Sequence, residues 1–223
     1  MAGKLIVIEG LDGSGKATQA QLVYENLLKQ GVNVKKISFP DYSQPSSSLV
    51  QMYLKGEFGE NPLDVNAYTA SSFYAVDRAA SFLKFWKKDY ENDAVILADR
   101  YTTSNEIYQL SKLTEDKKEE FLSWLEDFEY GKLKLPSPDA VIYLDVKPKV
   151  SQKLLSERYS GDESQKDIHE KNVRFLDECR NNAMYSAEKL KWRVVDCCDG
   201  DKIRAIEDIN RDIMNIISEV LFE

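Results

Sequence analysis

Residues 5–18 read Leu-Ile-Val-Ile-Glu-Gly-Leu-Asp-Gly-Ser-Gly-Lys-Ala-Thr, and this stretch decides the fold. The apolar run over residues 5–8 predicts a buried strand. Residues 10–16 then have the spacing of a phosphate-binding loop that leads into a helix. Glycines let successive backbone N–H groups converge on one anion, the helix N-terminus adds partial positive charge, and Lys16 adds a mobile full charge. The stretch therefore predicts a nucleotide phosphate site.

The residues expected at this phosphate site belong to the loop and to the first turn of the helix: Gly10, Asp12, Gly13, Ser14, Gly15, Lys16, Ala17 and Thr18. A glycine-rich turn can be purely structural, but the order of strand, loop, lysine and helix favours phosphate binding. Ala17 departs from the general pattern, because a hydroxyl residue is expected directly after the lysine. Thr18 lies about 100° further round the helix and does not replace it. The sequence therefore does not predict that this loop binds Mg²⁺ directly.

Length and composition are those of one α/β domain, which we expect to span residues 1–223. The chain has 38 acidic and 30 basic side chains, and its net charge of -8 argues against a nucleic-acid or membrane-surface partner. No apolar stretch approaches the ~20 residues that cross a bilayer, and the N-terminus has no signal-peptide pattern. The three cysteines lack metal-ligand spacing. These features predict a cytoplasmic protein.

Apolar runs that predict strands alternate with helical patterns along the chain. Strands are expected over residues 5–8, 34–38, 94–99, 140–146 and 192–195, and helices over residues 20–30, 46–54, 63–90, 104–113, 115–130, 167–191 and 203–221, with one more beginning at Pro148. This alternation predicts a parallel sheet with helices on both faces. Small and polar residues interrupt the pattern over residues 158–166, which we interpret as a mobile flap.

The helix expected over residues 115–130 has a strongly apolar face, made of Phe121, Leu122, Trp124, Leu125 and Phe128. Such a face packs either in the core of its own chain or against a second subunit. The sequence does not separate these two interpretations.

Four motifs together resemble those of thymidylate kinases of the bacterial kind: Glu9-Gly-Leu-Asp12-Gly-Ser-Gly-Lys16, Phe39-Pro40, Asp77-Arg78 and Asp99-Arg100-Tyr101-x-x-Ser104-Asn105. P-loop kinases share the first motif, but the ordered combination is specific and covers nearly the whole chain. The resemblance implies the P-loop kinase fold, a three-layer α/β sandwich with a five-stranded parallel sheet and a flexible lid at about residues 158–167. It also implies ATP-dependent phosphorylation of dTMP to dTDP in dTTP biosynthesis, with Mg²⁺ as cofactor, by a homodimer.

The resemblance also assigns the side chains that bind the base and the sugar of dTMP. Asp12 matches a position near the 3′-hydroxyl of the sugar. A carboxylate beside phosphates is unfavourable unless it contacts a hydroxyl or a metal, and this position would supply the hydroxyl. Arg78 resembles the arginine that hydrogen-bonds the thymine ring, with an aromatic residue one helical turn earlier stacked on the base. Counting back four residues gives Tyr74, while Phe73 lies off that face and is expected in the core.

Further dTMP contacts come from the other motifs. Asn105 and Tyr108 match positions near the base and the sugar, and Tyr108 would crowd a ribose 2′-hydroxyl. Arg100 matches the arginine that grips the acceptor phosphate, a task that suits a bidentate guanidinium. Tyr42 would add a hydroxyl donor, because this chain lacks the arginine that many members carry in the Phe-Pro segment. His169 stands where an aromatic residue usually covers the sugar; without the resemblance it is an ordinary surface histidine.

The remaining assignments concern the metal and the transferred group. Asp99, at a strand end, resembles the aspartate that holds Mg²⁺, and Glu170 would reach the water shell of the ion. The phosphate loop has no arginine, so the catalytic arginine of the family would come from the flap, where Arg158 is the first candidate and Lys166 the second. The expected catalytic residues are thus Lys16, Arg100 and Arg158.

A phosphate acceptor needs no general base, because its second pKa of about 6 leaves it largely dianionic at neutral pH. Catalysis then rests on alignment and on cancelling negative charge. The alternatives are a kinase for another (deoxy)nucleoside monophosphate or a nucleoside, and a non-catalytic nucleotide-binding module, which Ala17 favours. A nucleoside acceptor would favour a carboxylate base over the arginine at position 100. A GTPase would carry an Asn-Lys-x-Asp motif, which is absent.

Overall fold

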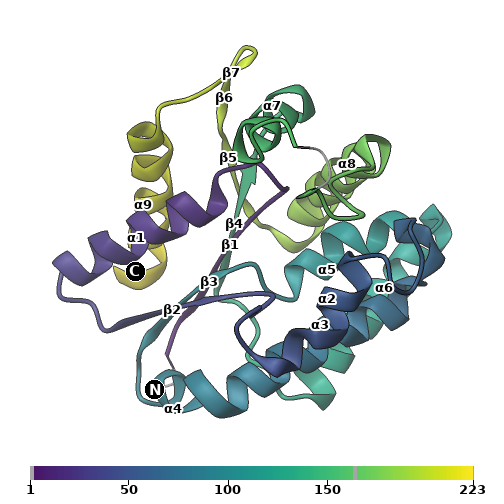
Figure 1. The fold of residues 1–223 in the computed structure, drawn as a ribbon. Helices are drawn as coiled ribbons and strands as arrows, with labels where there is room; N and C mark the ends of the chain where they lie inside the picture. The colour runs from purple at the N-terminus through teal and green to yellow at the C-terminus, as the bar shows by residue number, and fades with distance from the viewer. Residues whose placement is uncertain (1–2, 163–164, 223) are drawn as a thin grey trace.

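The computed structural model describes residues 3–162 and 165–222. Its main sheet has five parallel strands in the order β2-β3-β1-β4-β5, and they are β1 Leu5–Gly10, β2 Val34–Ser38, β3 Val95–Asp99, β4 Ala140–Asp145 and β5 Arg193–Asp196 (Figure 1). Such strands need crossovers, which the intervening helices supply. The predicted five-stranded parallel sheet is confirmed, and the structure adds the strand order.

The helices are α1 Lys16–Lys29, α2 Ser48–Leu54, α3 Ala67–Ser81, α4 Lys87–Glu91, α5 Thr103–Tyr108, α6 Glu115–Glu126, α7 Pro148–Arg158, α8 Val173–Leu190 and α9 Ile206–Phe222. Single 3₁₀ turns occur at Pro45–Ser47, Pro62–Asp64 and Leu110–Lys112, and π turns at Phe82–Trp86 and Asp127–Lys132. A hairpin that the sequence did not predict joins β6 Cys198–Asp199 and β7 Lys202–Ile203.

Two apolar clusters lie on opposite faces of the sheet, because successive side chains of β1 point to opposite sides. Ile6 and Ile8 pack in the cluster that includes the buried faces of α1 and α9. Leu5 and Val7 pack in the cluster that includes the buried face of α8 and Trp86. In Figure 1 the α1–α9 pair and the α2–α3–α5–α8 group cover the two faces of the sheet. The three-layer α/β prediction is therefore confirmed.

The parallel register gathers the ends of β1 and β3 at one edge of the sheet. Ile8 pairs with Asp99, so the aspartate that ends β3 lies beside the start of the phosphate loop. Arg100 follows in the left-handed region at φ 67, which an arginine adopts only when its surroundings hold it there. This turn belongs to the site described below.

Several expected helices differ in extent from those observed. The helix expected over residues 104–113 ends as α5 at Tyr108 and is followed by the 3₁₀ turn Leu110–Lys112, and the one expected from residue 203 begins at Ile206 because Ile203 lies in β7. The helix expected over residues 63–90 begins as α3 and passes through the π turn Phe82–Trp86 into α4, and the one expected over 115–130 ends in the π turn Asp127–Lys132. The prediction of a helix from residue 167 was wrong for six residues. Asp167 accepts hydrogen bonds from the backbone N–H groups of His169 and Glu170, which forms a turn, and Asn172 caps α8 by accepting from Phe175 N at 3.0 Å.

The apolar face of residues 121–128 is largely internal core. Phe121, Leu122 and Leu125 are buried against Ala67 and Leu110, so the core interpretation holds for these three side chains. Trp124 is only partly buried and stacks on Phe128 with ring centroids 5.1 Å apart. Within residues 3–162 and 165–222, no helix combines the length and apolarity needed to cross a membrane.

Candidate active site

The phosphate loop connects β1 to α1, and its glycines are required by the backbone. Gly13 and Gly15 both have φ 79, in the left-handed region that side chains avoid. A Cβ at Gly13 would also lie 2.5 Å from the Ser151 carbonyl oxygen. The loop therefore packs closely on α7, and its conformation depends on glycine at position 13.

Lys16 opens α1 and is almost completely buried. Its Nζ donates to the Leu11 carbonyl at 3.4 Å and lies 3.6 Å from Asp12 Oδ1. Burial, followed by the nearby Arg100, lowers the pKa of Lys16, and the Asp12 carboxylate opposes this shift. The lysine is thus held in place by loop oxygens, in the position from which it can reach bound phosphates.

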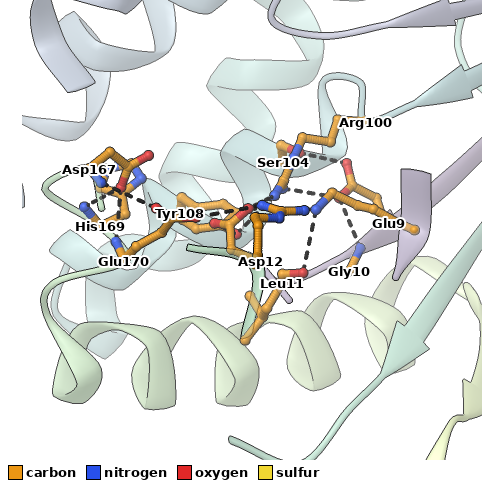
Figure 2. Close-up of polar contacts among 12 residues, drawn as sticks. Glu9, Gly10, Leu11, Asp12, Arg100, Ser104, Tyr108, Asp167, His169 and Glu170 are labelled. Atoms are coloured by element: carbon orange, nitrogen blue, oxygen red, sulfur yellow. Dashed lines mark hydrogen bonds and ion pairs between the residues drawn. The ribbon is translucent and has the colours of Figure 1, made fainter. Parts of the chain in front are cut away.

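Asp12, Arg100 and Tyr108 form one polar cluster at the edge of the loop (Figure 2). Arg100 Nη2 donates to Asp12 Oδ1 at 2.5 Å, and the Tyr108 hydroxyl donates to Asp12 Oδ2 at 2.8 Å. The guanidinium also lies over the Tyr108 ring, 5.2 Å from its centroid. Burial raises the pKa of Asp12, but the charges of Arg100 and Lys16 and the Tyr108 hydrogen bond outweigh it and lower the pKa overall.

Glu9 is a structural member of the site to which sequence reasoning assigned no role. It is fully buried and accepts hydrogen bonds from the hydroxyls of Thr103 and Ser104, both at 2.7 Å, and from Tyr101 N at 3.3 Å. These bonds tie the end of β1 to the first turn of α5. A glutamate inside an apolar strand was the available signal, because a buried carboxylate needs such partners.

Two adjoining cavities lie at this edge of the sheet. The larger, of about 760 Å³, is lined by most of the predicted phosphate-site residues and by the proposed metal and flap residues: Asp12, Gly13, Gly15, Lys16, Ala17, Thr18, Tyr42, Asp99, Arg100, Arg158, Lys166 and Glu170. The smaller, of about 60 Å³, is lined by seven of the eight predicted dTMP residues: Asp12, Tyr42, Tyr74, Arg100, Asn105, Tyr108 and His169. Gly10 ends β1 and Ser14 is buried in the loop, and neither lines one of these two cavities.

Tyr74 and Phe73 separate as expected from their positions on α3. Tyr74 lines the smaller cavity. Phe73 packs on the Phe58 ring, with centroids 5.5 Å apart. Of the two aromatic residues, Tyr74 is therefore the one placed to meet a ligand.

Arg78 differs from the expectation, because it lines neither cavity. Its side chain is 1% exposed, and its Nε and Nη2 donate to the two carboxylate oxygens of Glu129 at 2.6 and 2.5 Å. Its Nη1 donates to the Tyr101 carbonyl at 3.3 Å. A buried guanidinium needs a carboxylate partner, and the π turn Asp127–Lys132 supplies it from 51 residues away. Sequence reasoning missed Glu129 because no local pattern marks this pairing.

The smaller cavity and the Arg78–Glu129 pair are connected through Asn105. Its Nδ2 donates to Glu129 Oε1 at 3.2 Å and to the Ser71 carbonyl at 3.5 Å. With the amide nitrogen engaged there, the assignment that satisfies these bonds leaves Oδ1 as the group available to a ligand. Asn105 therefore offers the cavity an acceptor.

The predicted flap follows α7, and residues 163–164 of it lie outside the described part of the chain. Arg158 ends α7 with its side chain 53% exposed and its Nη1 3.9 Å from Glu170 Oε1. Glu170 is buried and accepts from the Tyr159 hydroxyl at 2.9 Å. Burial, followed by the Asp12 charge, raises the pKa of Glu170 and brings that of Asp167 to about 7. Burial and the nearby Asp12 carboxylate thus favour the protonated forms of these two carboxyl groups.

His169 is buried, in contrast to the surface histidine that its position alone suggests. Its ring stacks on Tyr108 with centroids 5.2 Å apart and planes at 18°, and its Nε2 lies 2.8 Å from the Tyr53 hydroxyl. Burial and the charge of Lys112 lower the pKa of His169 to about 3. The imidazole is consequently neutral near pH 7.

Asp99 is the residue that best fits a bound cation. Its Oδ1 is buried without a hydrogen-bond partner within the described residues, although it lines the phosphate cleft. Across that same part of the chain, no group of three or more His, Cys, Asp or Glu side chains could enclose a metal. This arrangement fits Mg²⁺, which usually binds one or two carboxylates and completes its shell with substrate phosphates and water.

Comparison with known proteins identifies the family. A family model described as thymidylate kinase matches residues 8–208. The thymidylate kinase of Mycobacterium tuberculosis (strain H37Rv) is 33% identical over 158 residues, which cover 70% of this chain and 71% of that protein. The thymidylate kinase of Plasmodium falciparum is 29% identical over 227 residues, covering 99% and 92%. The thymidylate kinase structure from Candida albicans, at 22% identity, shares the fold with a TM-score of 0.68 and covers 98% and 92% of the two chains. With the family model matching most of its length, the chain belongs to the thymidylate kinase family.

Proposed function

We propose that this chain transfers the γ-phosphoryl group of ATP to dTMP and yields dTDP for dTTP synthesis. The observation that carries the proposal is the Asp12–Arg100–Tyr108 cluster: Asp12 and Arg100 line both the phosphate cleft and the small cavity, and Tyr108 lines the small cavity. One cleft thus offers a lysine and a glycine loop for the donor, and an arginine for the acceptor phosphate. Two anionic nucleotides can bind there end to end.

The acceptor needs alignment and charge neutralisation more than proton removal, because a phosphate monoester is largely dianionic at pH 7. Arg100 would share its guanidinium between Asp12 and the acceptor phosphate. Asp12 would accept a hydrogen bond from the 3′-hydroxyl. Its lowered pKa makes it a hydrogen-bond acceptor but a poor general base, which weighs against a nucleoside as acceptor.

The base and the sugar would occupy the small cavity. Tyr74 would stack on the pyrimidine, and the Asn105 carbonyl oxygen would accept from its ring N–H. Arg78 would act indirectly, by holding Glu129 and through it Asn105. Tyr108 would clash with a ribose 2′-hydroxyl and so favour the deoxynucleotide. Tyr42 would donate a hydrogen bond to the acceptor phosphate.

Lys16, Arg100 and Arg158 would supply the cationic surroundings of the transferred group. Lys16 and the loop N–H groups would bind the outer phosphates of ATP. Arg158, exposed and 3.9 Å from Glu170, would turn toward the γ-phosphoryl group, with Lys166 as the second cation of the flap. Closing the flap over the cleft would keep water from accepting the phosphoryl group.

Mg²⁺ is the cofactor that we propose, and it would be held by Asp99, with Glu170 near its water shell. When bound, the ion would neutralise negative charge on the phosphate groups that take part in the transfer. Ala17 removes the usual loop hydroxyl, so Asp99 Oδ1, which lacks a hydrogen-bond partner among the described residues, would carry more of the coordination. The chain's own contribution is to place Asp99 beside the loop through the pairing of Ile8 with Asp99.

We also propose a single cytoplasmic domain over residues 1–223 that acts as a homodimer. Large apolar side chains exposed on α2, α3 and the π turn after α3 support the dimer: Leu49, Val76 and Leu83 are 40%, 51% and 70% exposed. Light scattering should give twice the chain mass, and Leu83→Lys should lower it to one chain. A monomeric mass for the unchanged protein would refute the dimer.

ADP release with ATP and Mg²⁺ across dTMP, dUMP, UMP, dCMP, dGMP, dAMP and thymidine tests the activity. The proposal requires dTMP to have the highest kcat/KM and thymidine to give no turnover. A preference for another monophosphate would assign that substrate instead. Nucleotide binding with no ADP release from any acceptor would show a non-catalytic module.

A further inference from the structure

Three polar side chains outside the phosphate loop form a hydrogen-bonded row that ends at His169. Lys112, in the 3₁₀ turn after α5, donates through Nζ to the Tyr53 hydroxyl at 2.9 Å and to the Val65 carbonyl at 2.8 Å. The Tyr53 hydroxyl, from α2, lies 2.8 Å from His169 Nε2. Tyr53 is fully buried, His169 is 4% exposed and Lys112 is half-buried. Neither Tyr53 nor Lys112 lines the small cavity.

The order of donors along this row sets the histidine tautomer. An ammonium group only donates, so Tyr53 Oη accepts from Lys112 and its own proton points to His169 Nε2. The opposite arrangement, with Nε2–H donating to Tyr53, would leave the hydroxyl proton without an acceptor in the described residues. Nε2 therefore carries the lone pair and Nδ1 carries the proton. Burial lowers the pKa of Lys112 to about 7, so below that pH the side chain is an ammonium group that can only donate to Tyr53.

The other end of the imidazole faces the acceptor site. Across residues 3–162 and 165–222, Nδ1 has no partner and is not sealed from solvent, and His169 lines the small cavity with Tyr74 and Asn105. The imidazole face stacks on Tyr108, whose hydroxyl binds Asp12. Fixing His169 therefore fixes both a free N–H donor and the position of the Tyr108 ring.

We propose that Lys112 and Tyr53 are positioning residues for the acceptor nucleotide: they hold His169 as the neutral Nδ1–H tautomer, which donates to an oxygen of the acceptor nucleoside and keeps Tyr108 in place. The substrate part rests on the proposed function, whereas the tautomer does not. The row is a property of this chain's own residues, and it acts through His169 without touching the reacting atoms.

The tautomer can be observed directly, because the chain contains one histidine. ¹⁵N-histidine labelling and long-range ¹H–¹⁵N correlation at about pH 6, without nucleotide, should show one neutral imidazole protonated at Nδ1. An Nε2–H tautomer or an imidazolium would overturn the proposal. Tyr53→Phe keeps the ring but removes the hydroxyl, and it should turn the single tautomer into a mixture. Lys112→Arg should retain the Nδ1–H form, while Lys112→Met should weaken it.

Steady-state kinetics test the positioning role. Losing one hydrogen bond of the row should raise KM for dTMP about three- to tenfold in Tyr53→Phe and Lys112→Met, with KM for ATP unchanged. Lys112→Arg should restore KM for dTMP. Tyr185→Phe is the matched control and should change neither constant. It removes a hydroxyl on α8 whose single hydrogen-bond partner among the described residues is Lys189, at 3.5 Å.

The possible results separate the positioning role of the row from the proposed function. A mixed tautomer with an unchanged KM for dTMP would overturn the positioning role. The positioning role would also be overturned if Tyr53→Phe lost kcat, ATP binding and thermal stability to the same extent as dTMP binding, and if Lys112→Arg behaved like Lys112→Met. These results would show a purely structural row. If dTMP is not phosphorylated at all, the proposed function fails. The imidazole tautomer of the unchanged protein would still show whether the Tyr53 hydroxyl donates to His169 Nε2.

Discussion

Replacing Glu129 by glutamine should strongly destabilise the protein, because it leaves the Arg78 guanidinium buried without its counter-charge. The side chains of the pair are 1% and 0% exposed. Glu129 accepts two hydrogen bonds from Arg78, one from Thr102 at 3.1 Å and one from Asn105 at 3.2 Å. Breaking one partner of a buried pair costs about 3–5 kcal/mol.

The size of the effect follows from the chain length. For domains of about 150–250 residues, 1 kcal/mol shifts Tm by about 2–4 °C, so Glu129→Gln should lower Tm by about 6–20 °C. Urea unfolding followed by circular dichroism gives the free energy independently, provided that the m-value stays constant. The matched control is Glu119→Gln, which breaks an exposed pair with Lys189 and should leave the urea midpoint unchanged.

The same variant also tests the route from Arg78 to the base site. Glutamine can donate where Glu129 only accepts, so Asn105 loses the partner that orients its amide, and KM for dTMP should rise. If Glu129→Gln lowered the free energy of unfolding by less than about 1 kcal/mol, the claim that each buried charge of the pair needs the other would be refuted. If Arg78 instead contacts the base directly, Glu129→Gln should leave stability nearly unchanged while Arg78→Met abolishes dTMP binding.

Three further variants test other parts of the structure. Arg100→Ala should raise KM for dTMP by at least about tenfold, because charged hydrogen bonds contribute about 1.5–3 kcal/mol, and unchanged dTMP kinetics would exclude Arg100 from the acceptor site. Arg158→Ala should lower kcat about a hundredfold with little change in ATP binding; if kcat persists, Lys166 is the flap cation. Burial and the Glu126 charge raise the pKa of Glu106 from 4.5 to about 8, so the folded state holds a proton that the unfolded state releases. The contribution of Glu106 to stability is therefore complete below about pH 4.5 and falls as the pH rises to about 8. Glu106→Gln should raise the urea midpoint more at pH 8 than at pH 5. An equal rise at both pH values would contradict the raised pKa of Glu106.

The sequence by itself determined the parts of this protein that depend on near neighbours. Residues 5–8 form a strand because they are apolar and continuous, and the loop that follows is specified by glycines that adopt φ 79 at positions 13 and 15. The one-turn spacing on α3, counted from Arg78 through the family resemblance, selected Tyr74 rather than Phe73, and Tyr74 lines the cavity. The spacing of apolar side chains and the backbone freedom of glycine are local properties, so a short stretch of sequence reveals them.

The tertiary structure decided which buried polar groups are paired. Arg78 turns to Glu129, 51 residues away, instead of to a cavity, and His169 is buried between Tyr108 and Tyr53. The start of α8 at Val173 likewise follows from side chains that bind the backbone of the preceding turn. A charged or polar group must find a partner when it loses water, and that partner is set by packing in three dimensions. No spacing along the chain encodes this choice, whereas the phosphate loop and its strand are encoded within fourteen consecutive residues, 5–18.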